Sequence, residues 1–383
     1  MSEPLITLRN VSQTFGSKKG DLKAVDDVSL SVGPGEVLCL VGESGCGKTT
    51  TARMAAGLAK PTAGTVEFQG RDIWSMSKSE FAEYRTAVQY VHQDPYASLN
   101  PIRDIHKTLA SPLRKHGVAR NRKEGWDKAA ALLEQVDLTP AEAYLPKFPH
   151  QLSGGQRQRV SVARALTLDP KLIIADESTS MLDVSIRIGM LNMLGRLRDE
   201  LNVGFLFITH DLAIAKYFGW QGRIAVMYLG RVVEFGPTPQ VINNPQHPYT
   251  KALLDAVPEP DPDLTRTKKA GGGLRSSEIP SLAMLPTGCS FHPRCPLFEA
   301  DTCDAHRPEL QGLDAGREVS CHVVGRAATT PEPTAEAGTV PEPTAQAGSV
   351  PEPTAQAGSV PGPAVQAGST PVIPQPRDGE ETE

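Results

Sequence analysis

The sequence has few aromatic residues, no long apolar run and no excess of positive charge. Phenylalanine, tryptophan and tyrosine make up 5% of its 383 residues, so the core must be built mainly from aliphatic side chains. The formal net charge of −5 gives no electrostatic basis for nucleic acid as the main partner. The longest apolar runs, such as residues 37–41 and 205–208, are much shorter than the ~20 residues of a membrane-spanning helix.

The first residues, MSEPLITLRN, lack the basic and apolar stretches of a signal peptide. We therefore expect a cytosolic protein that reaches a membrane only through a partner. Cysteine is scarce and unevenly placed: Cys39 and Cys46 stand near the start, and the other four of six lie between Cys289 and Cys321. In a reducing compartment such a cluster indicates a metal rather than disulfides.

Residues 1–258 have the pattern of an α/β domain. Residues 37–41, 172–175 and 205–208 are short continuous apolar runs, typical of parallel strands buried on both faces. LITLRNVSQTF and TVEFQG predict antiparallel strands, and RIAVMYLGRVVEF predicts a hairpin that turns at Gly230. The region 94–165, with the pattern AALLEQVDL, predicts a mostly helical subdomain. Apolar residues at helical spacing predict an amphipathic helix between the last two buried strands: Val184, Ile188, Leu191, Leu194, Leu197 and Leu201.

The composition changes after Pro258. A polar linker, PEPDPDLTRTKKAGGG, opens a region of residues 259–326 that holds the four clustered cysteines. Residues 280–325 are too few for a large core of their own, a deficit that a bound metal would relieve. Residues 327–383 repeat with a period of ten, as in PEPTAQAGSV, and predict a disordered, partly polyproline-like tail.

A phosphate-binding motif follows the first buried strand. GESGCGKT, residues 42–49, matches G-x-x-x-x-G-K-[ST] and opens a predicted helix. We expect Lys48 on the β- and γ-phosphates, the Thr49 hydroxyl on Mg²⁺, and Thr50 on phosphate, at a helix N-terminus that favours anions. The residues expected to bind nucleotide here are Gly42, Ser44, Gly45, Cys46, Gly47, Lys48, Thr49 and Thr50.

A second motif, KLIIADE, ends a buried strand in two acids. Asp176 is expected to hold Mg²⁺, because this hard cation takes oxygen ligands. Glu177 is placed to polarise the attacking water, so we predict a catalytic role for it. The alternative is a pair of helix N-cap residues, since DEST resembles a helix start.

LSGGQ, residues 152–156, is followed by Arg157 and Gln158. With the two motifs above in this order, the sequence resembles the ATP-binding-cassette (ABC) ATPases over residues 1–258. The resemblance implies an α/β P-loop NTPase core with antiparallel β and helical subdomains, working as a sandwich dimer. It also implies that four residues complete the ATP site of a facing subunit: Ser153, Gly154, Gly155 and Gln156. A serine before two glycines at a helix start offers unobstructed donors, which agrees with this role.

The same resemblance places the remaining catalytic landmarks. Gln93, in VHQDPYASLNP, resembles the glutamine-loop residue, which senses Mg²⁺ and the water and connects to a membrane subunit. His210, in ITHD, resembles the switch histidine, which contacts the γ-phosphate and acts with Glu177 and Lys48.

The resemblance also places three further landmarks. Asp183 closes a segment that resembles the D-loop, which communicates between the two sites, although Met181 stands where the family commonly has alanine. Phe15 resembles the aromatic residue that stacks on adenine, and Val25 is expected to pack against the same ring.

Two segments indicate a branch of the family. PQHPYTKALL, residues 245–254, resembles the extension of ATPases from oligopeptide and dipeptide importers, a group that includes some nickel importers. The cysteine-bearing segment resembles the C-terminal region of the same group, and its thiols are Cys289, Cys295, Cys303 and Cys321. Four thiolates can hold a [4Fe–4S] cluster or Zn²⁺, and the resemblance favours the cluster. Nearby His292, His306 and His322 leave mixed zinc ligation open, and a segment without metal is the third alternative.

These observations predict the ATP-hydrolysing subunit of a membrane importer for oligopeptides or dipeptides, with ATP and Mg²⁺ as cofactors. The resemblance implies a second, homologous ATPase subunit in a heterodimer, two transmembrane permeases and an extracytoplasmic peptide-binding protein. The chain would then lie at the cytoplasmic face of the membrane. The alternatives are the same role for nickel or another small solute, and a soluble ABC ATPase acting on ribosomes or DNA.

Overall fold

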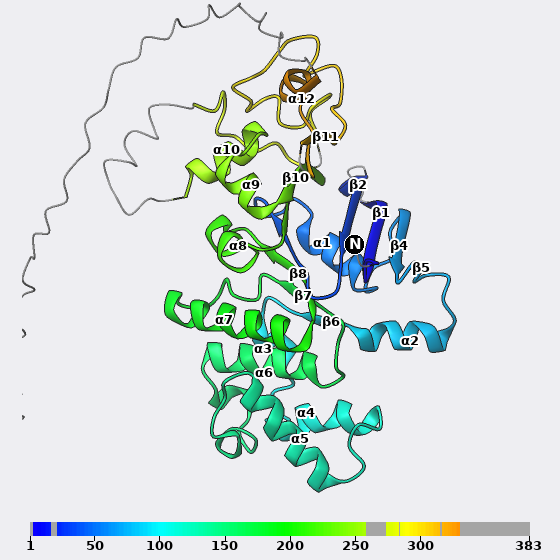
Figure 1. Ribbon diagram of the computed structural model, residues 1–383, viewed down its shortest axis with the longest axis vertical. Coiled ribbons are helices and arrows are strands. Elements are labelled where there is room, and N and C mark those ends of the chain that lie inside the picture. The colour runs from blue at the N-terminus through cyan, green and yellow to red at the C-terminus, as the bar shows by residue number, and fades with distance from the viewer. Residues whose placement is uncertain (1–2, 17–20, 258–272, 283, 315, 330–383) are drawn as a thin grey trace, which may run out of the picture. The chain divides into compact units, whose positions relative to one another are not determined.

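The computed structural model describes residues 3–16, 21–257, 273–282, 284–314 and 316–329 (Figure 1). The described residues all belong to one unit of contacts, residues 1–332. The predicted tail of residues 327–383 lies outside the described residues except for 327–329, which end a helix.

An eight-stranded sheet forms the centre of this unit. Its middle strands are parallel, and antiparallel strands continue the sheet at one edge. In spatial order they are β11 (Gln311–Asp314), β12 (Arg317–Val319), β10 (Arg231–Pro237), β9 (Arg223–Tyr228), β3 (Val37–Val41), β8 (Gly204–Thr209), β7 (Leu172–Asp176) and β6 (Val88–Val91). The predicted buried parallel strands and the hairpin at Gly230 are confirmed.

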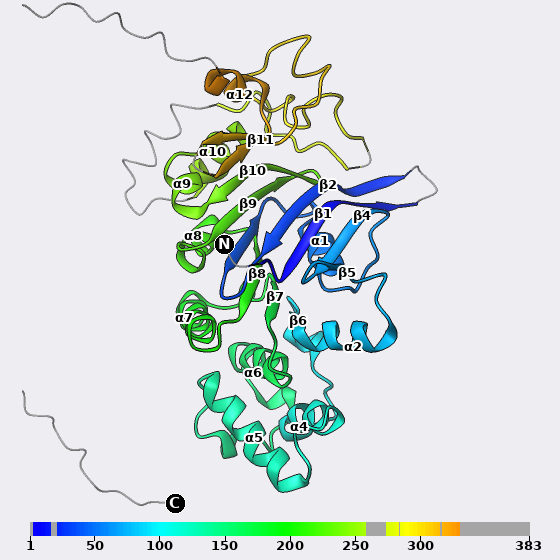
Figure 2. The same cartoon turned by 45° about the vertical axis from the view of Figure 1, so that its right-hand side comes forward.

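A second, four-stranded sheet is antiparallel, as predicted. Its order is β2 (Leu22–Val32), β1 (Ile6–Phe15), β4 (Ala63–Phe68) and β5 (Arg71–Asp72). Figure 2 shows this sheet crossing in front of the central strands, with β2 reaching toward β10. The two sheets enclose α1 (Lys48–Ala55), which contacts strands of both.

The remaining helices cover the central sheet and form the predicted helical subdomain. They are α2 (Lys78–Ala87), α3 (Pro95–Ser98), α4 (Ile105–Lys115), α5 (Arg122–Gln135), η1 (Ala141–Ala143), η2 (Pro149–Gln151), α6 (Gly154–Leu166), α7 (Val184–Leu201), α8 (Leu212–Phe218), α9 (Thr238–Asn243), α10 (Pro248–Asp255) and α12 (His322–Thr329). Figures 1 and 2 both show α4 and α5 together, beyond α6. Within the described ranges, no helix combines the length and the apolar character needed to cross a lipid bilayer.

Strand alternation explains why the central strands are continuously apolar. Leu38 and Leu40 of β3 face one core, which lies toward the antiparallel sheet. Val37, Cys39 and Val41 of the same strand face the other core, beneath the helices. Because successive side chains point to opposite faces and both faces are covered, every position of the strand must be apolar.

The predicted apolar stripe of α7 is only half right. Leu191, Leu194 and Leu197 are buried, but Val184, Ile188 and Leu201 are 68%, 45% and 40% exposed. Neighbouring elements cover the middle of the helix, where α7 meets α6 and α8, and leave its two ends open. Helical spacing records the face of a helix but not how far along that face the neighbours extend.

The cysteine-bearing segment has a core, but it shares that core with the cassette. β12 pairs with β10 through Glu234 and Phe235, so the C-terminal strands extend the central sheet. Phe291 and Cys295 belong to the main hydrophobic cluster. The segment therefore does not rely on a core of its own, because its apolar residues pack against the larger domain.

Candidate functional site

The loop between β3 and α1 carries the GESGCGKT motif. Gly47 has a φ of 107°, and a Cβ there would lie 2.4 Å from the carbonyl oxygen of Ala24 in β2. A Cβ on Gly42 would lie 2.1 Å from the carbonyl oxygen of Met227 in β9. Only glycine fits at these two positions, because the backbones of both strands approach the loop closely.

Lys48 lies inside this loop, with its side chain buried. Its Nζ donates hydrogen bonds to the carbonyl oxygens of Gly42, at 2.7 Å, and Glu43, at 2.8 Å. It is also the first residue of α1, where the free backbone N–H groups of a helix favour an anion. Thr49 is exposed and Thr50 is half-buried, so both side chains are accessible beside the loop.

The two acids of KLIIADE lie at the end of β7, next to Thr49. The Thr49 hydroxyl donates to Oδ1 of Asp176 at 3.2 Å, and the Tyr90 hydroxyl donates to Oδ2 at 2.7 Å. Burial raises the pKa of Asp176, and the hydrogen bonds from Tyr90 and Thr49 oppose that rise. The arrangement leaves a carboxylate beside the Thr49 hydroxyl, which is a donor set suited to Mg²⁺.

Glu177 follows in a strained backbone conformation, with a φ of 44°. Its N–H donates to the carbonyl oxygen of Ile208 at 3.0 Å, which fixes it against β8. Oε2 accepts a hydrogen bond from Nε2 of Gln93 at 3.0 Å, and Oε1 lies 3.5 Å from Nδ1 of His210. The structure thus brings together Gln93, Glu177 and His210 from three separate loops, as the sequence predicts.

The LSGGQ segment forms the start of α6. The Ser153 Oγ accepts from the Gln156 N–H at 3.3 Å, and the Gln156 Oε1 accepts from the Ser153 N–H at 3.0 Å, which makes a capping box. Ser153 is exposed, and a Cβ on Gly154 would meet no atom within 4 Å. In the part of the chain that the structure describes, no hydrogen bond joins this segment to the phosphate loop.

The other predicted nucleotide contacts differ in exposure. Phe15 is 47% exposed at the end of β1, whereas Val25 is fully buried in the core between the two sheets. Asp183 is exposed and occupies the N-cap position of α7, where its side chain makes no capping hydrogen bond. Met181 is 63% exposed beside it.

The segment HPYT begins α10 and forms a hydrogen bond to the phosphate loop. Buried Glu234 accepts hydrogen bonds from the N–H of Gln246, at 2.8 Å, and of His247, at 2.9 Å. Nδ1 of His247 caps the helix by accepting from the Tyr249 N–H at 3.0 Å, and burial lowers the pKa of His247 to about 3. The Tyr249 hydroxyl then accepts a hydrogen bond of 2.9 Å from the N–H of Glu43.

The four clustered cysteines are free thiols, and they lie close enough for their charges to interact. Burial raises the pKa values of Cys289 and Cys295 to about 11, and the charges of neighbouring thiols, including Cys303 and Cys321, add to the rise. The N–H of Cys289 also donates to the carbonyl oxygen of Cys303 at 2.8 Å. Among the described residues, no three or more histidine, cysteine or acidic side chains are arranged to hold a metal ion. The predicted [4Fe–4S] or Zn²⁺ site is therefore not supported by this arrangement.

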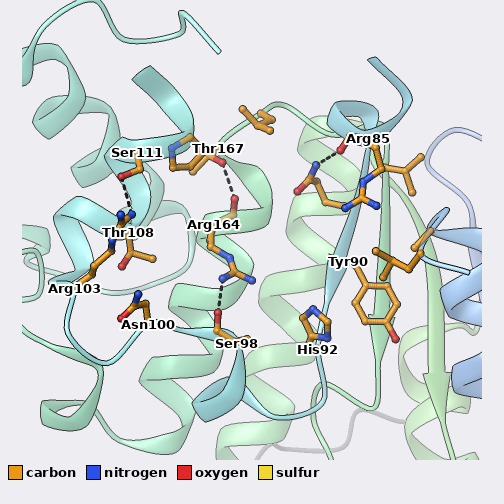
Figure 3. Close-up of a pocket in the computed structure, with 16 residues that line it drawn as sticks. Arg85, Tyr90, His92, Ser98, Asn100, Arg103, Thr108, Ser111, Arg164 and Thr167 are labelled. Carbon is orange, nitrogen blue, oxygen red and sulfur yellow. Dashed lines mark hydrogen bonds between the residues drawn. The ribbon is translucent and has the colours of Figure 1, made fainter. Parts of the chain in front are cut away.

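Two adjoining pockets extend from the acids toward the helical subdomain. One, of about 680 Å³, reaches Thr49, Gln93 and Asp176. The second, of about 480 Å³, is shown in Figure 3, and its lining includes three arginines, Arg85, Arg103 and Arg164. The two pockets share several lining residues: Leu58, Tyr90, His92, Ser98 and Arg164. A group bound in the second pocket would thus touch the walls of the first.

Several residues of the site have no motif of their own. Tyr90 was missed, although its position near the end of a strand, three residues before Gln93, is a usable signal. Glu43 occupies a variable position of the phosphate-binding motif, and Arg294 lies more than two hundred residues away, in the cysteine-bearing segment. Only the folded chain brings these last two together.

The chain matches two described families. Residues 25–180 match "ABC transporter", and residues 233–303 match "Oligopeptide/dipeptide transporter, C-terminal region". It is 43% identical over 335 residues to the "Probable peptide ABC transporter ATP-binding protein y4tS" of Sinorhizobium fredii, covering 86% of this chain and 92% of the relative. It is 45% identical over 305 residues to the "Oligopeptide transport ATP-binding protein OppF" of Salmonella typhimurium, covering 80% and 89%.

A solved structure has the same fold. The ATP-binding cassette MJ0796, a dimer in a post-hydrolysis state bound to ADP and Pi, is 30% identical, with a TM-score of 0.55. The similarity covers 61% of this chain and 98% of MJ0796. The α/β cassette predicted from the sequence motifs is confirmed, with its antiparallel sheet and helical subdomain.

Proposed function

The chain belongs to the family of ABC transporter ATP-binding proteins, and we propose that it is the ATP-hydrolysing subunit of an importer for oligopeptides or dipeptides. The observation that carries this proposal is the convergence of Thr49, Asp176 and Glu177 beside the phosphate loop. The relatives named above are peptide transport proteins, which favours peptide cargo over nickel or another small solute. The matched C-terminal region favours an importer over a ribosome- or DNA-directed ATPase.

Each residue of the convergence has a role that its geometry can perform. Lys48, already inside the loop, exchanges carbonyl partners for phosphate oxygens and stabilises the charge of the transferred group. Thr49 and Asp176 would hold Mg²⁺, with Gln93 at its edge, and the cation would neutralise charge on the phosphates. Glu177 orients the attacking water, and Gln93 and His210 hold its carboxylate in place.

A second cassette completes the site. Ser153 and Gly154 are open to a partner, and their helix N-terminus supplies donors for a γ-phosphate held by another subunit. The dimeric state of the similar cassette MJ0796 supports this arrangement. We propose a homologous subunit as the facing cassette, which co-purification of two different ATPases with the permeases would test.

Attachment to the membrane would go through permease subunits. The pocket of Figure 3 adjoins the pocket that reaches Gln93 and Asp176, so changes at the ATP site would alter the surroundings of a permease segment bound there. Its three arginines suit acidic or carbonyl groups. We propose that the chain lies peripherally, at the cytoplasmic face of the membrane, with an extracytoplasmic peptide-binding protein as the cargo receptor.

The proposed function does not require a metal at the cysteine cluster. Metal loading is a separate hypothesis, supported only by the chemistry of four nearby thiols. Iron, sulfide and zinc analysis of the purified chain would decide it. No step of ATP hydrolysis depends on the result.

The function is tested by uptake of labelled di- and oligopeptides in cells that lack the gene, complemented with wild type or with Glu177→Gln. We expect only the wild-type gene to restore uptake. Equal uptake in the deletion strain and the complemented strain would overturn peptide import while leaving the ATPase assignment intact.

A further inference from the structure

The cysteine-bearing segment reaches the phosphate loop through one buried arginine. Both oxygens of the Glu43 carboxylate lie 3.2 Å from Nη1 of Arg294, and Nη2 adds a third contact of 3.2 Å to Oε1. The Arg294 side chain is only 7% exposed, so this ion pair is largely shielded from water. A two-pronged contact of this kind fixes the direction of the carboxylate as well as its distance.

Glu43 is bound through its side chain, its N–H and its carbonyl oxygen. Arg294 contacts its side chain, the Tyr249 hydroxyl accepts from its N–H, and its carbonyl oxygen accepts from Nζ of Lys48. Two of these three partners belong to the C-terminal region matched in the comparisons, at residues 233–303. The third is the lysine that we propose to bind the phosphates. The position of Lys48 therefore depends on a residue that the C-terminal region fixes.

A second contact from the cysteine-bearing segment also leads to the phosphate loop. Arg307 forms an ion pair with buried Asp26, which also pairs with Arg231 at 2.8 Å. The Asp26 N–H donates to the carbonyl oxygen of Gly230 at 2.9 Å, and the Gly230 N–H donates to that of Cys46 at 2.9 Å. These bonds link Asp26 through Gly230 to Cys46, which lies in the phosphate loop three residues after Glu43.

The cysteines hold the turn that presents Arg294. The N–H of His292 donates to the carbonyl oxygen of Cys289, and the N–H of Cys295 donates to that of His292. Arg294 donates its own N–H to the carbonyl oxygen of Phe291, whose ring is buried in the main core. The guanidinium therefore projects from an anchored turn toward the loop.

We infer that the cysteine-bearing segment positions the phosphate loop for ATP, with Arg294 as the positioning residue acting through Glu43. This inference rests on the ATP site proposed above. Arg294 has two effects in this role: it fixes the loop, and it neutralises a carboxylate that would otherwise repel the phosphates. Without the arginine, Glu43 would be an unpaired anion in the loop that is proposed to bind the phosphates.

The test is a double-mutant cycle on the purified full chain, with binding of a fluorescent ATP analogue and steady-state ATPase as readouts. We expect Arg294→Gln to weaken nucleotide binding and raise KM about five- to tenfold, with kcat changed less than about twofold. Glu43→Gln alone should weaken binding about twofold or less, because an amide oxygen still accepts from Arg294. Arg294→Gln combined with Glu43→Gln should bind more tightly than Arg294→Gln but about two- to threefold more weakly than wild type, because no unpaired carboxylate is left while the contact that fixes the loop is lost.

Arg326→Gln is the matched control, since Arg326 pairs with Glu299 in the same region, and it should bind nucleotide like wild type. Thermal unfolding of each variant shows whether it folds. If Arg294→Gln does not fold, Arg294→Lys, which keeps the positive charge, takes its place in the binding measurement. Wild-type affinity in Arg294→Gln would overturn the inference, and so would a loss that Glu43→Gln fails to relieve. If the wild-type chain itself did not bind the analogue, the proposed function as an ATPase, on which this inference depends, would be overturned.

Discussion

The hydroxyl of Tyr90 donates a hydrogen bond of 2.7 Å to Oδ2 of Asp176, across the parallel strands β6 and β7. Thr49 donates to the other oxygen of the same carboxylate. Two donors thus hold in one orientation an acid whose pKa is raised by burial. Removing either donor leaves the carboxylate less well stabilised and free to rotate.

Tyr90→Phe should therefore weaken Mg²⁺ binding. We expect the Mg²⁺ concentration for half-maximal ATPase activity to rise about threefold, from the loss of one hydrogen bond to a charged group. A Mg²⁺ titration of the steady-state rate measures this. Tyr217→Phe is the control, since the Tyr217 hydroxyl bonds Asn192 on the surface. If Tyr90→Phe required no more Mg²⁺ than that control, Tyr90 would not be holding Asp176.

Glu177→Gln should abolish hydrolysis without abolishing binding. The glutamine keeps the size of the side chain and an oxygen that can accept from Gln93, but it cannot polarise the attacking water. We expect the steady-state ATPase rate to fall at least about a hundredfold while the affinity for the fluorescent ATP analogue changes little. Glu200→Gln, at the exposed end of α7, provides the control. Turnover at the rate of that control would show that another group activates the water.

Local sequence patterns predicted the buried strands and the loop residues that follow them. The apolar runs at residues 37–41, 172–175 and 205–208 can only be strands covered on both faces, and parallel strands bring the residues at their carboxyl ends together. Motifs assigned Lys48 and Asp176 to the site and the resemblance to ABC ATPases assigned His210, and the parallel strands explain why the three lie at one edge of the sheet. The distances between these residues in the fold follow from the pairing of the parallel strands, and the apolar runs in the sequence identify those strands.

Contacts made by tertiary packing alone could not be predicted. Arg294 and Glu43 have no shared motif, and their pairing depends on how β10, α10 and the cysteine-bearing turn pack. Likewise, the apolar spacing of α7 could not reveal that Val184 and Ile188 lie beyond their neighbours. The domain boundary at residue 258 stays a prediction, because residues 258–272 lie outside the described ranges.

The two glycines of LSGGQ should respond differently to alanine. A Cβ on Gly155 would lie 2.6 Å from Cγ2 of Ile186 in α7, whereas a Cβ on Gly154 would meet nothing. Gly155→Ala should therefore destabilise the chain by about 1–3 kcal/mol through overpacking. Gly154→Ala should leave the free energy of unfolding within about 0.5 kcal/mol of wild type and still lower the ATPase rate, because the added methyl blocks a donor used by the facing subunit.

Urea unfolding and steady-state ATPase of both variants measure these differences. Gly195→Ala controls for helix propensity, since a Cβ on Gly195, in α7, also meets no atom. Full ATPase activity in Gly154→Ala would contradict the role of this segment in a partner's site. Equal stability of Gly154→Ala and Gly155→Ala would contradict the packing of Gly155 on Ile186.

His247 should make the fold sensitive to mild acid. Burial lowers its pKa to about 3, while an unfolded histidine titrates near 6.5, so the unfolded chain takes up a proton that the folded chain refuses. The stabilisation is complete above pH 6.5 and is lost as pH falls toward 3, at up to about 1.4 kcal/mol per pH unit. Buried Glu234 has a raised pKa and acts in the opposite direction, so the effect of His247 must be isolated by substitution.

His247→Asn keeps a helix-capping side chain without a titrating group. Between pH 7.5 and pH 5.5 the free energy of unfolding of this variant should fall by about 1 kcal/mol less than that of wild type. His116→Asn, at an exposed helix end, should keep the wild-type slope, and a parallel loss of stability in all three proteins would show that His247 is not the group that titrates.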